Sequence, residues 1–147
     1  MLLEWVDVFG EDYYVELQRH GLDDIDNTGM SQEDVNQVLI RLANKYNIPI
    51  IATNDSHYIE EEDASAHDIL LCVNTGESKY TPKGHGKGFR FGFPNNEFYF
   101  KSQEAMKQLF SDVPNAIENT IAIADKVKGI HLKRDFPVLP KFSIPEG

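Results

Sequence analysis

Cysteine and long apolar runs are almost absent from this sequence. The single cysteine, Cys72, has no partner for an internal disulfide, which favours a reducing compartment. It lies in the short apolar run 69–73, so a small buried side chain is a stronger interpretation than a nucleophile or metal ligand. No run is long enough to cross a bilayer, and the start lacks a basic segment, so we expect a soluble, cytoplasmic protein.

Basic residues are also scarce. The 147 residues hold 14 Lys and Arg against 24 Asp and Glu, for a net charge of -10. Such a surface repels the phosphate backbone, so we expect the chain alone to bind nucleic acid poorly. Residues 79–90 are a local exception, because they contain basic residues and no acid. They are a candidate contact to DNA or to another domain, through Lys79, Lys83, Lys87 and Arg90. A solvated surface loop is the alternative interpretation.

What is present is enough for a folded domain. A hydrophobic content of 41% is typical of a globular protein and rules against disorder. Residues 12–18 read as a strand, because Val15 and Leu17 alternate with polar neighbours. Glu16 and His20 fall on the opposite, even-numbered face of this strand. We expect Glu16 and His20 to be second-tier neighbours of a site at the rim where the parallel strands end, and not ligands. The alternative is a surface acid and a loop histidine.

A helix is predicted from Ser31, which forms a potential capping box with Asp34. Asn47 is a suitable end for this helix, and Pro49 forbids its continuation. The apolar stripe at helical spacing comprises Val35, Val38, Leu39, Leu42, Ala43 and Tyr46. The apolar segment that follows predicts a second strand, so strand, helix and strand together indicate a parallel βαβ unit.

The second strand runs directly into Asp55 and His57, the most informative residues of the chain. Alternation along an extended strand predicts that these two side chains project to the same side. Delivery of a carboxylate and an imidazole to the ends of parallel strands is how an α/β barrel supplies metal ligands. A loop-capping aspartate beside an ordinary histidine is the structural alternative.

The remaining segments alternate between helices and irregular chain. Residues 60–73 predict a helix with an acidic start, and the glycine-rich residues 77–96 predict a long loop. Residues 97–100 suit a short strand. Ser102 and Asp112 are predicted caps of two further helices, the second ending at Gly129. The proline-rich end reads as an extended linker.

About two confident parallel strands are too few for a closed barrel of roughly eight. The chain is therefore expected either to belong to a larger protein or to pair with another copy through its exposed barrel edges.

Several segments, taken in order, resemble the alpha (catalytic) subunit of bacterial replicative DNA polymerase III. The main ones are 14–21, 52–58 and 66–76, followed by 97–102 and by shorter matches at 114–120 and 139–142. The resemblance covers nearly the whole chain and implies the C-terminal part of the polymerase-and-histidinol-phosphatase (PHP) domain. The implied fold is α/β: a partial, distorted PHP-type barrel of about two parallel strands with covering helices, then a small helical segment and an extended tail.

The resemblance also implies boundaries along the chain. Residues 1–76 would be the C-terminal part of the PHP barrel, and 77–101 a long loop with a short strand. Residues 102–129 would be a helical segment, and 130–147 a linker toward the polymerase palm.

The family's last ligand motif, Asp-x-His, maps onto Asp55 and His57. A complete PHP site in this family holds up to three metal ions, here expected to be zinc or manganese, and some members are metal-dependent 3′–5′ exonucleases. The family's first motif, His-x-His, and the palm aspartates that bind magnesium do not occur in this sequence. We therefore expect no polymerase catalytic residue here, no tight metal binding and no activity in the chain alone.

Through the full-length protein the resemblance implies DNA, deoxynucleotides and other replisome subunits as partners. Two alternatives remain at this point: a stand-alone PHP-type metal-dependent phosphoesterase, and a purely structural or interaction module.

Overall fold

The computed structural model describes residues 2–25, 27–129 and 131. The elements run α1 (Leu2–Phe9), η1 (Gly10–Asp12), β1 (Val15–Leu17), α2 (Gln32–Tyr46), β2 (Ile50–Ala52), η2 (Glu61–Asp63), α3 (Ala64–Thr75), α4 (Gln103–Leu109) and α5 (Asn115–Lys126). The mixed α/β class is confirmed, and the arrangement is consistent with part of a barrel. No helix in the described part of the chain has the length and apolar character needed to span a membrane.

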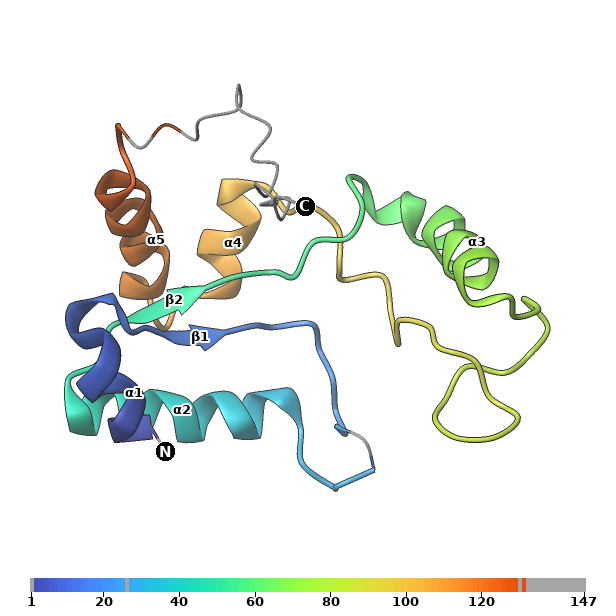
Figure 1. The fold of residues 1–147 in the computed structure, drawn as a ribbon, viewed down its shortest axis with the longest axis horizontal. Helices are drawn as coiled ribbons and strands as arrows, with labels where there is room; N and C mark the ends of the chain where they lie inside the picture. The colour runs from blue at the N-terminus through green and yellow to red at the C-terminus, as the bar shows by residue number, and fades with distance from the viewer. Residues whose placement is uncertain (1, 26, 130, 132–147) are drawn as a thin grey trace, which may run out of the picture.

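The two strands form the predicted parallel pair. Val15 lies opposite Ile50 and Leu17 opposite Ala52, and α2 makes the connection between the strands. In Figure 1, α2 lies beside β1, whereas α5 lies beside β2. Each strand is only three residues long, so the strand predicted over 12–18 was too long.

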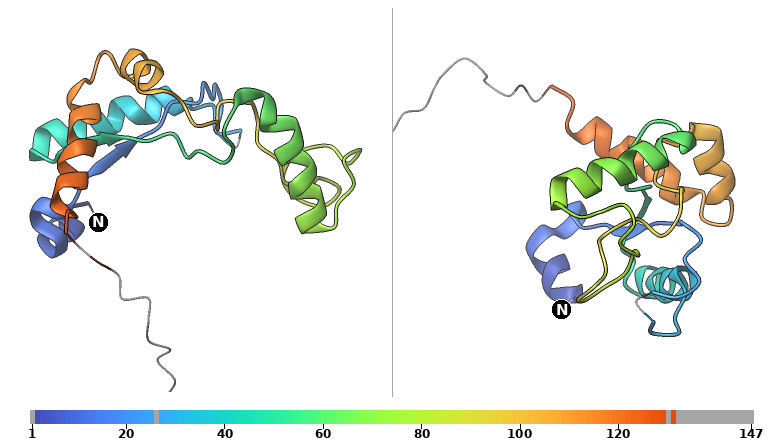
Figure 2. Two further views of the ribbon diagram at one scale, coloured as in Figure 1. Left: turned by 90° about the horizontal axis from the view of Figure 1, so that it is seen from above. Right: turned by 90° about the vertical axis from the view of Figure 1, so that its right-hand side faces the viewer.

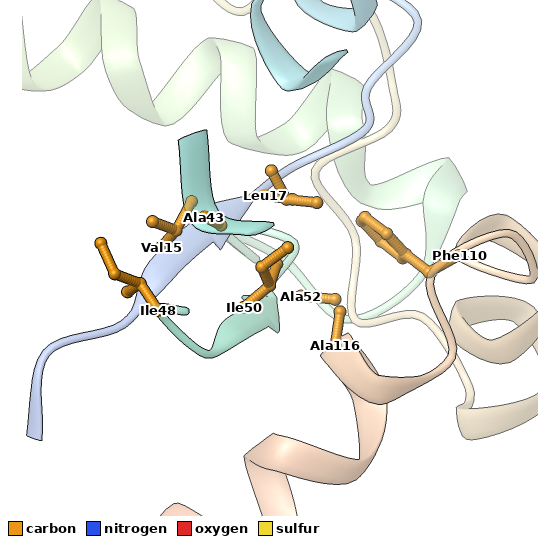
Figure 3. Close-up of a cluster of buried hydrophobic side chains, with 8 residues drawn as sticks. All are labelled: Val15, Leu17, Ala43, Ile48, Ile50, Ala52, Phe110 and Ala116. Carbon is orange, nitrogen blue, oxygen red and sulfur yellow. The ribbon is translucent and has the colours of Figure 1, made fainter. Parts of the chain in front are cut away.

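One hydrophobic core joins the strands to the helices around them (Figure 3). Its buried members are Val15, Leu17, Ala43, Ile48, Ile50, Ala52, Phe110 and Ala116. Leu17, Ala43, Phe110 and Ala116 have no exposed surface. Because these side chains come from both ends of the sequence, α4 and α5 belong to the same packed body as the βαβ unit.

Helix α2 begins and ends where the sequence predicts. The Ser31 hydroxyl accepts from the Asp34 amide, the Asp34 carboxylate accepts from the Ser31 amide, and Asn47 closes the helix with φ of 53°. The predicted stripe was partly wrong. Ala43 is buried, but Val38 and Tyr46 are 39% and 38% exposed.

Helix α3 stands apart from this body, at the right of Figure 1, and the left view of Figure 2 shows the same separation from above. It continues from η2 and ends at Gly76, whose φ of 71° suits glycine. The acidic residues of η2 confirm the predicted acidic start of this helical segment. The following residues 77–96 contain no helix or strand, as predicted, apart from an isolated bridge between Lys83 and Arg90.

Three expectations for the second half need correction or fall outside the structure. Residues 97–100 do not form a strand and make only an isolated parallel bridge, Tyr58 with Tyr99. Ser102 caps α4 as predicted, but α5 begins after Pro114, and Asp112 caps nothing. The linker expected over 130–147 lies outside the described residues, except for 131.

Candidate functional site

The site is built on residues 54–58, which leave the end of β2. The strand stops at Ala52, and Asp55 adopts a left-handed backbone with φ of 44°, a conformation that Asp tolerates better than most residues. Asp55 and His57 nevertheless come together, with 3.3 Å between Asp55 Oδ1 and His57 Nε2. Their side chains are 51% and 39% exposed. The turn, rather than strand alternation, makes this pair.

Asn54 fixes the turn by hydrogen bonds to other segments of the chain. Its Nδ2 donates to the carbonyls of Glu97 (3.0 Å) and Tyr99 (2.7 Å), while its own carbonyl accepts from His20 Nε2 (3.0 Å). Asn54 is 8% exposed, and within the described structure its Oδ1 has no hydrogen-bond partner. One residue therefore joins three segments that are distant in sequence.

Residues 97–101 run beside the turn and hold its backbone. The His57 amide donates to the Phe98 carbonyl at 2.8 Å, and the Phe100 amide donates to the Tyr58 carbonyl at 2.9 Å. Lys101 supports this segment, because its Nζ donates to the Glu97 carbonyl at 2.6 Å and pairs with the Glu97 carboxylate at 2.8 Å. This segment thus supports the turn through backbone hydrogen bonds, although it does not form the predicted strand.

His20 is a structural residue rather than a rim ligand. It is 1% exposed, stacks on Phe98 at 4.1 Å between ring centroids, and its Nε2 is bonded to Asn54. Gln32 holds it twice: Gln32 Oε1 accepts from the His20 amide at 2.6 Å, and Gln32 Nε2 lies 3.1 Å from Nδ1. Because both ring nitrogens are engaged, neither is available to a metal ion in this arrangement.

Glu16 does not share a face with His20. Its side chain is exposed and accepts a 2.5 Å hydrogen bond from Thr53 Oγ1. β1 ends at Leu17, so strand alternation does not extend to His20, and the prediction of a common face was wrong.

Aromatic rings and a second histidine surround His57. The His57 ring lies 4.5 Å from that of Phe93 and 5.5 Å from that of His67, and His67 also contacts the Tyr58 ring at 5.3 Å. Burial lowers the pKa of His67, and proximity to His57 lowers it further. The packing of His67 against these rings supports one side of the site.

The basic loop is tied to α3 by Asp68. Arg90 is 5% exposed, and its two terminal nitrogens donate to the two Asp68 oxygens at 2.8 Å each. Lys83 lies 3.2 Å from the same carboxylate. Hydrogen bonding from Arg90 lowers the pKa of Asp68 from 3.8 to about 2, although burial opposes the shift.

This geometry corrects part of the predicted DNA-contact surface. Arg90 is buried in an ion pair, and Lys83 is shared between Asp68 and the Phe93 carbonyl. Neither guanidinium nor ammonium is free to meet a phosphate in this arrangement. Lys79 and Lys87 are exposed, and for them contact with DNA or another domain stays a prediction.

A second ion network, missed in the sequence, joins α2 to the turn between α4 and α5. Arg19 bonds to Asp112 at 2.6 and 2.9 Å, to Glu33 at 3.0 and 3.1 Å, and to the Leu109 carbonyl at 2.7 Å. Hydrogen bonding to Asp112 raises the pKa of Arg19, and Arg19 lowers that of Asp112. This explains why Asp112 caps no helix. No local sequence signal connects residues so far apart.

The donor chemistry of Asp55 and His57 fits a zinc or manganese site, since carboxylate and imidazole are common ligands of these ions. Within the described ranges, however, no group of three or more His, Cys, Asp or Glu could hold a metal ion. A metal ion at Asp55 and His57 would therefore need further donors to close its site.

The fold and the site define a class: a mixed α/β segment with two parallel strands, the second of which leads to a carboxylate–imidazole pair. No protein-family model matches the chain. Over 138 residues it is 43% identical to the DNA polymerase III subunit alpha of Borreliella burgdorferi, covering 94% of this chain and 11% of that protein. The subunits named alike from Treponema pallidum and Campylobacter jejuni are each 40% identical, over 94% and 92% of this chain.

Over the segment compared, the chain belongs to the family of DNA polymerase III alpha subunits. It spans about 11% of the length of the Borreliella and Treponema relatives.

Proposed function

We propose that this chain works as one part of a replicative DNA polymerase, in which the whole polypeptide carries out template-directed DNA synthesis in the bacterial cytoplasm. The observation that supports this most strongly is the 43% identity to a polymerase III alpha subunit over 94% of the chain. DNA, deoxynucleotides and other replisome subunits are then the partners of the whole protein, and magnesium acts at a palm site formed by other residues.

Within that protein, the chain forms the C-terminal part of a PHP domain and leads toward the palm. The parallel strands β1 and β2, with α2 between them in sequence, are compatible with a piece of such a barrel. The body formed with α4 and α5 gives the palm a rigid support, because these helices share the core of the βαβ unit.

Asp55 and His57 bind zinc or manganese in this proposal, together with ligands from elsewhere in the polypeptide. Their 3.3 Å separation allows both to approach one ion, and their side chains remain accessible. A bound divalent ion would polarise a phosphodiester and activate a water molecule for 3′–5′ exonuclease chemistry. The contribution of this chain is to fix the pair through Asn54 and the segment 97–101.

A second candidate is a structural module in which Asp55 and His57 bind no metal. The contact between the two side chains favours it, since each group already has a charged or polar partner. Metal content separates the two candidates.

The polymerase proposal is tested with the full-length protein that carries this chain. We expect template-dependent primer extension with magnesium and all four deoxynucleotides. The Asp55→Asn, His57→Asn double variant should extend primers at the wild-type rate, because the proposal assigns DNA synthesis to palm residues and not to the PHP pair. Absence of extension by the wild-type protein would contradict the proposal.

A further inference from the structure

The outer side of α3 carries an uncovered apolar stripe. Ile69, Leu70 and Val73 are 47%, 54% and 72% exposed, and Ala66 is exposed on the same helical face. Spacings of three and four residues place these four side chains together. We call them the α3 stripe.

The opposite side of the same helix is already occupied. His67 packs against Phe93 and Tyr58, Asp68 binds Arg90, and Cys72 is 7% exposed. A helix that is packed on one side and carries an apolar stripe on the other is characteristic of a protein interior. Because α3 stands away from the main body (Figure 2), its own fold covers only one of these sides.

Charge around the α3 stripe is negative at both ends. Glu61, Glu62 and Asp63 precede the helix, where acids also favour the positive end of its dipole. Glu77 follows the helix, and the last turn contains no basic residue, so the negative end of the dipole has no cation from its own sequence. A basic group supplied from outside would complete this end.

We propose that the α3 stripe docks an apolar helical face bordered by Lys or Arg, contributed by another segment of the same long polypeptide. A second copy of this chain fits less well, since an antiparallel pair of α3 helices would bring Glu77 of each copy next to the acidic start of the other. The length favours an intramolecular source: the chain spans about 11% of its relatives. The choice of the same polypeptide as the source of the docking helix rests on the proposed function, whereas the exposed α3 stripe does not.

Cysteine labelling tests the proposal. A Leu70→Cys variant is compared with Ser65→Cys, an exposed position on α3 outside the stripe, in the 147-residue chain and in the full-length protein. Mass spectrometry reports alkylation at each site, and buried Cys72 serves as an internal reference. In the full-length protein we expect the thiol of Leu70→Cys to react at least about tenfold more slowly than in the chain alone, whereas the thiol of Ser65→Cys reacts alike in both. Adding Glu77→Lys to Leu70→Cys should weaken the protection.

Equal reactivity of the Leu70→Cys thiol in the chain and in the full-length protein would overturn the proposal. Sedimentation showing that the chain dimerises, with the dimer abolished by Leu70→Glu, would instead identify a second copy as the occupant and would also overturn it. Primer extension is measured on the same full-length variants. An inactive protein in which the Leu70→Cys thiol is protected would contradict the polymerase function alone, and an active one in which this thiol is reactive would contradict the docking alone.

Discussion

The Asp68 carboxylate holds the loop 77–96 against α3 through its ion pair with Arg90. We therefore expect the substitution Asp68→Asn to release this loop. The Arg90 side chain is 4% exposed and forms two 2.8 Å bonds to a carboxylate that is itself 14% exposed. Replacing the carboxylate leaves a buried guanidinium without its counter-charge. Breaking a buried ion pair in this way is strongly destabilising, because the remaining charge is uncompensated. Because this ion pair is the loop's main anchor on α3, we expect the loop to open locally before the core unfolds.

The magnitude follows from the pKa of Asp68, which falls from 3.8 to about 2. A shift of this size corresponds to about 2 kcal/mol at neutral pH, reduced to about 1–2 kcal/mol by solvent and by Lys83 on the exposed side. The open population of the loop should therefore rise about 5- to 30-fold in Asp68→Asn. Trypsin measures it directly, as the rate of cleavage after Lys83 and Arg90.

The pH dependence has a definite sign. Because the folded-state pKa of Asp68 is depressed, the stabilisation is complete above about pH 3.8 and is lost as the pH falls toward about 2. The difference in thermal stability between wild type and Asp68→Asn should disappear over that window. Glu62→Gln, which removes an exposed acid near the same helix, should change neither measurement. Equal trypsin cleavage of wild type and Asp68→Asn would refute the reasoning.

Three further substitutions test other parts of the structure. Asn54→Ala removes two hydrogen bonds to residues 97–99 and should lower the free energy of unfolding by about 1–3 kcal/mol in denaturant titration, against no change for Asn44→Ala on the exposed side of α2. Phe110→Ala empties a site with no exposed surface and should cost about 3–5 kcal/mol, so a loss below about 1 kcal/mol would contradict the core described. Arg19→Met should cost about 1–3 kcal/mol and increase amide exchange at the α4–α5 turn; unchanged exchange there would show that the network is not what holds it.

Local signals in the sequence were sufficient for several elements. The capping box of Ser31 and the left-handed end at Asn47 define α2, because both depend on residues within one turn of each end. The glycine after α3 and the serine before α4 act in the same local way. The parallel pairing of β1 with β2 followed from the length of the helical connection.

Contacts between distant residues account for the errors. Asp112 has the composition of a helix cap, yet it bonds to Arg19, 93 residues away. Arg90 looks like a solvated base in a glycine-rich loop, yet it is buried against Asp68 on α3. A residue's own neighbours in sequence carry no information about either partner.

The candidate site was predicted in part. The sequence identified Asp55 and His57 as a pair, and the structure brings them together. Strand alternation was the wrong explanation for this pair, because the chain leaves the strand before Asp55. Glu16 and His20 were wrongly grouped on one face, since Glu16 is exposed and His20 is buried. The supporting role of Asn54 required the position of residues 97–101, which only the folded chain provides.

The most direct test of the central claim is the amount of zinc or manganese retained by the full-length protein after dialysis, with and without His57→Asn. We expect stoichiometric metal in the wild type and a clear loss in His57→Asn. The control His131→Asn, which replaces an exposed histidine outside the site, should retain the wild-type amount. The same metal content in wild type and His57→Asn would contradict the assignment of His57 as a ligand.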